Sequence, residues 1–451
     1  MIHRDALREY TRGSLWVLPT LCVLAALLAG SLLSLVNVGP NSPLAFQGTA
    51  DDARSLLIGI TSTMVTVIAL LLGLAVVALQ LSSTQFSPRL LRNFLRDRPN
   101  QIVLGVFVGT FAFSTAGLFT VGVSAGQRSD QFPRFAVSVA VALLFLSLAL
   151  LVFFADHLAH SLQVDHIMLV VERTTLPVIH DLPRAGEQAP MVPATATAIP
   201  ARSSGYVQVV YVNQLVAQAA AQQVHLRIRP RIGEHVVAGA TLAWVWPTST
   251  DRPAPDPDTF GAMLAGTVRI GFERTLEQDP GFGLRQLVDT ACKALSPAVN
   301  DPYTAIQAIE HLAVLFTALA ARPVGEHVAH DRTGTSTVAI PARSFAEHLA
   351  LGVGLIRRYG AAEPTVIQAL LRLLSTTLGA TDDPERWTAI DEQAQLLVAD
   401  AERAVAQPAD LAPVHTEADT LRRALAKRRT PIAELEIPPS PHHQVTPPPP
   451  I

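Results

Sequence analysis

The sequence is poor in charge, in lysine and in cysteine. Charged residues make up 16% of its 451 residues, against about 25% in soluble proteins, while hydrophobic residues reach 49%. That deficit favours a membrane protein. The two cysteines, Cys22 and Cys292, imply no disulfide framework. The net charge of −3 gives no global basic field, so we expect no nucleic-acid partner.

Four long apolar runs in the first third of the chain predict a transmembrane domain over residues 1–182. The expected spans cover about 14–37, 56–82, 101–125 and 135–156. Each exceeds the roughly 18–20 residues that a helix needs to cross the hydrocarbon core, so the lipid bilayer is the expected partner. A cleaved signal peptide is the alternative for the first run, but its core is too long and it lacks a convincing small-x-small cleavage site.

Arginine placement predicts the orientation of these spans. The N-terminus carries three arginines and the connection between spans two and three carries four, whereas the first loop has only Arg54, beside Asp51 and Asp52. The third loop has two. Because cytoplasmic loops carry an excess of Lys and Arg, we expect a multi-pass protein of the inner (plasma) membrane with both termini in the cytoplasm.

Polar residues inside the spans leave two interpretations open. Those of the second span include Thr61, Ser62, Thr66 and, at its inner end, Gln80. In the third span, Gly105 and Gly109 form a small-xxx-small pair that lets helices approach closely. Packing is the simpler role for all of them, and lining a hydrated path is the other. No ionisable residue lies mid-membrane, which disfavours a proton relay.

The segment between the second and third spans predicts an amphipathic helix over residues 87–98. Its apolar residues recur at helical spacing, and Arg89, Arg92 and Arg96 fall mostly on the opposite side. Such a helix can lie in the inner interface with its arginines facing anionic headgroups. It is either an ordinary juxtamembrane anchor or a lipid-responsive gate between the two spans.

A weak metal-binding candidate follows the fourth span. Asp156 and His160 are four residues apart and share a helix face. A carboxylate and an imidazole can contribute to a metal site, but no third ligand is fixed by spacing. Contacts of a helix end with headgroups or a neighbouring subunit explain the pair better, so we expect no metal and no cofactor.

After the spans, composition divides the chain into four parts. They are a Pro- and Ala-rich linker at 183–204, a β-rich module at 205–275, a helical domain at 276–428 and a disordered Pro-rich tail at 429–451. The expected fold is thus a four-helix transmembrane domain followed by an α+β cytoplasmic region. Within the β-rich module, Ile232 to Leu242 resembles the hairpin of a small lipoyl- or biotinyl-type barrel. That hairpin contains no lysine, which excludes swinging-arm chemistry.

A dense set of polar residues marks the start of the helical domain. Its members are Arg274, Asp279, Arg285, Asp289, Asn300 and Asp301. Asp301 can cap a helix that begins near Pro302 and extends over about 303–321. Buried Arg–carboxylate pairs and caps explain the set structurally, and a ligand or partner site explains it functionally. Catalysis has the least support, because no nucleophile–base pair or ligand trio is visible.

Several motifs together resemble the DUF2254 family of bacterial membrane proteins. They are Gln85-Phe86-Ser87-Pro88-Arg89, Ser204-Gly205-Tyr206-Val207, Glu273-Arg274-Thr275, Gln278-Asp279, Phe282-Gly283, Leu295-Ser296-Pro297 and Asn300-Asp301-Pro302. The resemblance covers most of residues 10–400. It implies a four-span membrane protein with a cytoplasmic region, and it implies no established activity.

Two functions are compatible with these observations, and an enzyme is the least supported class. The first is a channel- or transporter-like homo-oligomer gated by its cytoplasmic domain. Four spans enclose little by themselves, so a pore needs several subunits. The second is a membrane-anchored sensor or scaffold that binds a small-molecule metabolite or a protein through its cytoplasmic region.

Overall fold

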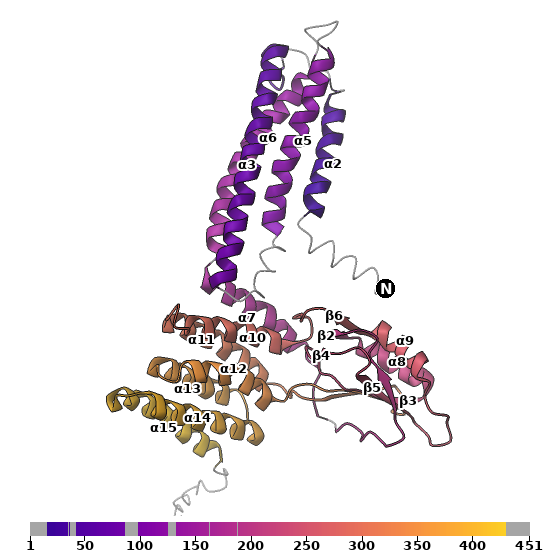
Figure 1. Ribbon diagram of the computed structural model, residues 1–451, viewed down its shortest axis with the longest axis vertical. Helices are drawn as coiled ribbons and strands as arrows, with labels where there is room; N and C mark the ends of the chain where they lie inside the picture. Colours follow the sequence, from indigo (N-terminus) through magenta and orange to yellow (C-terminus); the bar gives the residue numbers. More distant parts are fainter. Residues whose placement is uncertain are drawn as a thin grey trace, which may run out of the picture.

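The structure, a computed structural model, describes residues 16–34, 36, 42–85, 98–124, 132–161, 163–186 and 188–429. Within these residues, Figure 1 shows a stalk of long helices standing on a broader platform of helices and sheets. The predicted interfacial helix, with Arg89, Arg92 and Arg96, lies outside the described residues except for its last position. The Pro-rich tail from residue 430 onward lies outside them too.

The stalk consists of α2 (Val17–Leu33), α3 (Ala50–Gln85), α5 (Arg98–Ser124) and α6 (Arg134–Ser161), which lie side by side (Figure 1). Of the helices in the described residues, α3, α5, α6 and α11 (Pro302–Ala320) are long and apolar enough to cross a membrane. Helix α2 is also apolar and has 17 residues. At 1.5 Å per residue it is about 26 Å long, slightly less than the ~30 Å of a hydrocarbon core.

Helix α11 has the hydropathy of a membrane span but lies in the platform. Its residues Ile309, Leu312 and Phe316 are buried in one apolar core with residues of α7 (Val164–His180) and α13 (Pro364–Gly379). Figure 1 shows it lying across the direction of the stalk. Protein contacts therefore account for its apolar character, and the four spans expected from the sequence correspond to α2, α3, α5 and α6.

Small and polar residues pack the stalk helices against one another. Gly105 and Gly109 of α5 face Cys22 of α2, and a Cβ at Gly105 would come within 2.8 Å of the Cys22 Sγ. The hydroxyls of Thr110 and Ser147 lie 3.1 Å apart between α5 and α6. These are the close approaches that the packing interpretation of the small-xxx-small pair predicts.

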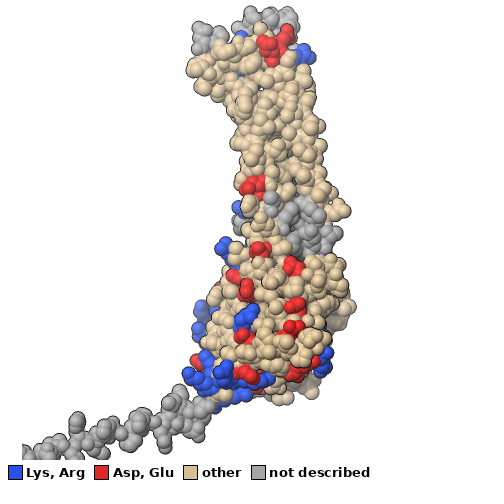
Figure 2. All heavy atoms as spheres, turned by 90° about the vertical axis from the view of Figure 1, so that its left-hand side faces the viewer, with Lys and Arg blue, Asp and Glu red and all other residues tan. Residues whose placement is uncertain are grey.

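Charged side chains avoid the middle of the stalk. On the face that Figure 2 shows, Asp, Glu, Lys and Arg lie at the two ends of the stalk and over the platform, with a long uncharged band between them. At the end distant from the platform, Arg134 donates hydrogen bonds to the carbonyl oxygens of Phe46 (2.8 Å) and Gly48 (2.9 Å). An uncharged band of this kind suits the hydrocarbon region of a bilayer.

A helical domain with one extended apolar core forms half of the platform. Besides α7, α11 and α13, it contains α10 (Pro280–Ala294), α12 (Phe345–Tyr359), α14 (Pro384–Ala404) and α15 (Pro408–Arg429). The sequence predicts a helix at 303–321 and further amphipathic helices at 344–359, 363–378, 384–405 and 412–426. Helices α11 to α15 occupy these positions within a few residues.

Capping groups fix where two of these helices begin. The Asp301 side chain accepts a hydrogen bond from the Thr304 backbone N–H (3.2 Å), and Pro302 occupies the first turn of α11, as predicted. Ser344 and Glu347 form a reciprocal capping box at the start of α12. Each cap satisfies backbone donors that the first helical turn leaves unpaired.

Two sheets with two covering helices form the rest of the platform in the described residues. In chain order the elements are β1 (Thr197–Pro200), β2 (Gly205–Val210), α8 (Val212–Gln222), β3 (Val224–Ile228), β4 (His235–Val236), β5 (Thr241–Pro247), α9 (Pro257–Thr267), β6 (Val268–Gly271), β7 (His327–His330) and β8 (Thr337–Ile340). One sheet has the order β1-β5-β3-β8-β7, with β3 and β8 parallel, and the other has the order β4-β2-β6. Leu215 of α8 and Phe260 of α9 are buried in the core of this sheet module.

The arrangement of strands differs from the expectation in three respects. The predicted hairpin from Ile232 to Leu242 is not formed, because β4 pairs with β2 whereas β5 pairs with β1 and β3 in the other sheet. The predicted linker at 183–204 contains β1, and the helical segment expected at 276–428 is interrupted by β7 and β8. Short strands and pairings between distant segments explain the differences, because local sequence patterns do not encode them.

Candidate functional site

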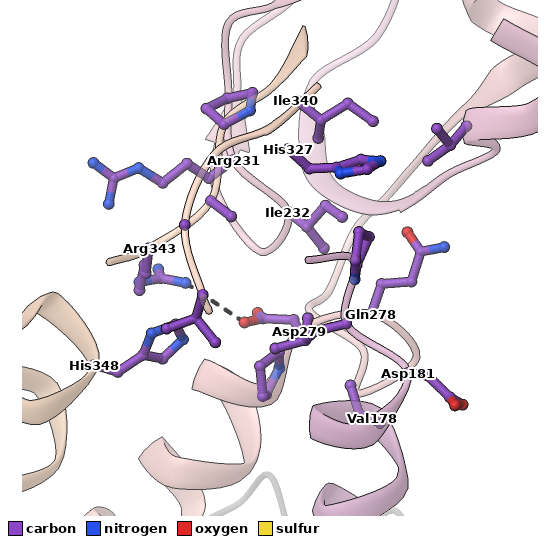
Figure 3. A pocket seen from close by; sticks show the side chains of 18 of the residues that line it. Val178, Asp181, Arg231, Ile232, Gln278, Asp279, His327, Ile340, Arg343 and His348 are labelled. Atoms are coloured by element: carbon purple, nitrogen blue, oxygen red, sulfur yellow. Dashed lines mark ion pairs between the residues drawn. The ribbon is translucent and has the colours of Figure 1, made fainter. Parts of the chain in front are cut away.

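A cavity of about 320 Å³ lies where α7, the sheet module and the helical domain meet. Figure 3 shows its lining side chains converging from these parts. They come from the end of α7, the β3–β4 turn, the segment before α10, the segment before β7, the β8–α12 connection and α12 itself. Its size is in the range of sites that hold small ligands.

Asp279 is the most deeply buried charged group in the cavity wall. Its side chain is only 2% exposed. Arg274 donates to its Oδ2 from Nε (3.0 Å) and Nη2 (2.6 Å), and the Nη1 of Arg343 lies 3.5 Å from its Oδ1. Gly233, with a φ of +82°, leaves the space that the carboxylate occupies. Burial raises the pKa of the Asp279 carboxyl, and the positive charge of Arg274 opposes that rise.

Two arginines line the cavity from other elements. Arg343 lies in the β8–α12 connection with its side chain mostly buried, and its guanidinium makes no hydrogen bond to the part of the chain that the structure describes. Burial lowers the pKa of Arg343, and the charge of Asp279 opposes that effect. Arg231 pairs with Glu347, its Nη1 2.7 Å from Oε1. On this side of the cavity, three arginines share the carboxylates of Asp279 and Glu347, whereas Asp181 lies on the opposite side.

His348 of α12 contributes a buried neutral imidazole to the wall. The residue is 4% exposed, and burial lowers its pKa to about 4. Its Nδ1 lies 2.9 Å from the Ser344 carbonyl oxygen. Because a carbonyl only accepts, Nδ1 carries the proton, and Nε2 is left as the acceptor of the ring.

This geometry suits binding better than catalysis. The Asp279 carboxylate is held by two donors of Arg274, so it is poorly placed to accept a proton from a substrate. A partly buried guanidinium beside an apolar wall has the character of a recognition site for a small anion.

Comparison with known sequences places the chain in a family. The model of the predicted membrane protein family DUF2254 matches residues 12–376. The chain belongs to the DUF2254 family. An uncharacterized protein of Mycobacterium tuberculosis strain H37Rv, Rv1290c, is 44% identical over 424 residues, which cover 91% of this chain and 80% of the relative. An uncharacterized protein of Mycobacterium bovis, Mb1321c, has the same identity and coverage. No solved structure matches the chain.

The other polar residues singled out in the sequence lie outside the lining of this DUF2254 pocket. Arg285 and Asp289 form an ion pair one turn apart on α10, with Nε 2.7 Å from Oδ1. Asn300 is exposed and adopts a φ of +52° in the turn before α11, which Asp301 caps. Of the six predicted residues, Asp279 lines the cavity and Arg274 lies behind it.

The polar side chains of α3 in this DUF2254 protein do not face the interior of the stalk. Ser62 and Thr66 are exposed, and Thr61 is half-buried. The hydroxyls of Thr61 and Thr66 donate to carbonyl oxygens of their own helix, those of Leu57 (2.8 Å) and Ser62 (3.1 Å). Gln80 is exposed as well. A path lined by these residues would therefore have to lie outside a single copy.

The weak metal candidate of the sequence is a surface pair. The Nδ1 of His160 lies 2.9 Å from the Asp156 carbonyl oxygen and 3.5 Å from its carboxylate, and both side chains are exposed. Among the described residues, no three His, Cys, Asp or Glu side chains come together as a metal site would require.

Sequence reasoning missed most of the titratable residues that line the pocket. Arg231, Arg343, His327 and His348 come from separate segments and meet only in the folded chain. One local signal was available for His348, because the Ser344-x-x-Glu347 pattern predicts a helix start just before it. Such a cap places a residue on a helix but not at a cavity.

Proposed function

We propose that this protein is a membrane-anchored receptor for a small ligand that binds between the sheet module and the helical domain. The stalk serves as the anchor, and the arginine distribution favours a cytoplasmic location for the platform and both termini at the plasma membrane. The observation that carries the proposal is the lining itself. Segments of α7, of the sheet module and of the helical domain converge on one cavity of ligand size.

Helix α7 connects this pocket directly to the stalk. Two residues separate the end of α6 from the start of α7, and Val178 near the other end of α7 lines the cavity. Helix α7 is fixed to the helical domain by Glu172, whose Oε2 lies 2.7 Å from the Nδ1 of His311. It also packs so closely on α10 that a Cβ at Gly283 would overlap Thr175. A ligand that shifts the sheet module against α7 would therefore act on α6.

A variant that fills the cavity tests this function. Ile232→Trp places a large ring in the lining. Val237→Trp is the matched control, because Val237 directly follows β4, is exposed and does not line the cavity. Full-length proteins in nanodiscs are incubated with a bacterial metabolite extract and examined by native mass spectrometry. We expect a bound small molecule in the natural protein and in the control, and its loss in Ile232→Trp. Equal binding in all three proteins, or none in the natural protein, would contradict the proposal.

A channel formed by several copies is the second candidate, and the exposed face of α3 favours it. Gly59, Ser62, Thr66 and Gly73 recur along that helix at intervals of three, four and seven residues, and additional Cβ atoms at Gly59 and Gly73 would meet no neighbour. A face of small and hydroxyl side chains suits close contact between α3 helices of neighbouring copies. A hydrated path would then run between copies, since the buried residues of the described stalk are mainly apolar.

Ion flux and oligomeric state separate the two candidates. Under the channel proposal, the protein in liposomes conducts ions, and Gly59→Leu with Gly73→Leu abolishes both the oligomer and the flux. Ile58→Leu, a change at another exposed position of α3, serves as the control. A monomeric, non-conducting protein that still binds its ligand would remove the channel candidate and leave the receptor.

A further inference from the structure

The side of the pocket around Arg343 is rich in positive charge. Arg231, Arg274 and Arg343 share the carboxylates of Asp279 and Glu347, and Asp181 lies on the other side of the cavity, so Arg343 has no close counter-charge of its own. A partly buried cation without a matched anion is unfavourable, because desolvation is not repaid. A monoanionic ligand beside Arg343 would supply that close counter-charge.

Arg343 is the arginine whose guanidinium N–H donors make no hydrogen bond to the described residues. Arg231 has its contact with Glu347 at 2.7 Å, and Arg274 gives both its Nε and Nη2 hydrogens to Asp279. Arg343 approaches Asp279 only at 3.5 Å, which is too long for a strong hydrogen bond. Figure 3 shows this guanidinium beside His348 and the Asp279 carboxylate. A planar guanidinium with free donors matches the two oxygens of a carboxylate.

The remaining wall of the cavity is apolar. Its aliphatic side chains are Val178, Leu182, Val212, Ile232, Val324 and Ile340. They enclose the space beyond the arginines and favour a ligand with an apolar body, since apolar surface gains about 25 cal/mol for each Å² removed from water. A ligand that is charged throughout, such as a free inorganic anion, would leave this wall unused.

The acidic side chains around the cavity disfavour a ligand of higher charge. Glu277 pairs with Arg269, and Asp279 already shares Arg274 and Arg343. Asp181 also belongs to the lining, and in Figure 3 it lies on the side opposite Arg343. A second negative charge on the ligand would find no free arginine and would be repelled by these carboxylates.

We infer that the pocket binds a small monocarboxylate with an apolar body, whose carboxylate pairs with Arg343. The inference rests on the proposed receptor function and names its ligand class. His348 adds an acceptor, because its Nδ1 is engaged by the Ser344 carbonyl and its Nε2 is the other polar atom of the ring. A hydroxyl or N–H group near the carboxylate of the ligand would strengthen binding.

The test uses three monocarboxylates of different shape: 2-naphthoate, 4-phenylbutyrate and octanoate. Binding of each to the full chain in nanodiscs is measured by equilibrium dialysis, with empty nanodiscs subtracted. Methyl 2-naphthoate and inorganic phosphate serve as the uncharged and the non-apolar counterparts. We expect at least one monocarboxylate to bind, its methyl ester to bind at least tenfold more weakly, and phosphate not to bind.

Protein variants test whether Arg343 is the residue that binds the carboxylate of the ligand. Arg343→Gln should weaken binding at least tenfold, and Arg343→Lys should weaken it less, because lysine keeps the charge but loses the paired donors. Arg332→Gln, at an exposed arginine in the β7–β8 turn, should bind like the natural protein. The ester comparison needs no variant, so misfolding of an Arg343 variant would not obscure the outcome.

Two results would overturn the inference in different ways. If none of the three acids binds while the metabolite extract still gives an adduct that Ile232→Trp abolishes, the ligand class is wrong and the receptor function stands. If the acids bind with equal affinity to natural protein, Arg343→Gln and Ile232→Trp, their site is elsewhere and the assignment of this pocket fails.

Discussion

Acidification should loosen the first turns of α12, because His348 is buried there as a neutral imidazole. The residue is 4% exposed, and its pKa is lowered to about 4 from an ordinary value of 6.5. Burial is the main cause, and the charges of Arg343 and Arg231 act in the same direction. The Ser344 carbonyl and Glu347 oppose it by favouring the protonated ring.

The sign and size of the effect follow from proton linkage. The folded state binds the proton of His348 more weakly than the unfolded state, so its stabilising contribution is complete above pH 6.5 and is lost as the pH falls towards 4. One pKa unit corresponds to about 1.4 kcal/mol, so the whole loss is about 3 kcal/mol. At pH 5 the loss is about 2 kcal/mol, or roughly thirtyfold in the opening equilibrium of α12.

Hydrogen exchange on the full chain in nanodiscs measures this loss locally. Protection factors of the α12 amides, corrected for the intrinsic pH dependence of exchange, are compared at pH 7.5 and pH 5. We expect a decrease of about thirtyfold in the natural protein. His348→Gln should remove most of the pH dependence, since it leaves a side chain that does not titrate in this range.

His415→Gln controls for the loss of any histidine. His415 is a half-exposed residue of α15 that lies 3.6 Å from Glu402. This variant should keep the pH dependence of the natural protein in α12. A pH dependence that is the same in the natural protein and in His348→Gln would refute the reasoning, because the buried imidazole would then not be its source.

Three further predictions concern backbone space, capping and thiol reactivity. Gly233→Ala should lower the free energy of unfolding by roughly 3 kcal/mol or more, because its Cβ would overlap the buried Asp279 carboxylate. Gly239→Ala is the control and should cost about 1 kcal/mol, because Gly239 has a similar φ of +86° but no neighbour within 4 Å. Equal losses of unfolding free energy in the two variants on chemical denaturation would contradict this. Asp301→Ala should lower the free energy of unfolding by about 1 kcal/mol, because the α11 cap is lost, and it should leave ligand affinity unchanged. A tenfold loss of ligand affinity would instead give Asp301 a binding role. Burial raises the pKa of the Cys292 thiol to about 11, so iodoacetamide at pH 7.5 should leave it unmodified in the folded protein, as peptide mapping would reveal.

The helices of this protein could be predicted from the sequence because their signals are local. The apolar runs of the stalk are long enough to identify without any partner. In the helical domain, the Asp301-Pro302 pair predicted the start of α11, and the predicted end at 321 lies one residue beyond the observed end. Arg274–Asp279 and Arg285–Asp289 are Arg–carboxylate pairs of the general kind that the structural explanation of the polar set invokes, although the sequence did not specify which residues would pair.

The sheet module could not be predicted in the same way, because its order depends on distant pairings. Strand β8 lies more than 100 residues after β3, yet Leu226 pairs with Val338. Strand β1 has four residues and falls in a stretch whose proline and alanine content resembles a linker. The pocket could not be predicted for the same reason, since Arg231 and Arg343 are brought together by the pairing of β3 with β8.

A ligand in this pocket should join the sheet module to α7 and so influence the stalk. Hydrogen exchange across the full chain in nanodiscs, with and without a saturating concentration of whichever of the three monocarboxylates binds most tightly, tests it most directly. We predict added protection in residues 178–182 and 340–348, and a change in the last turns of α6. Binding that leaves α7 and the β8–α12 connection unchanged, or that protects only the stalk, would contradict it.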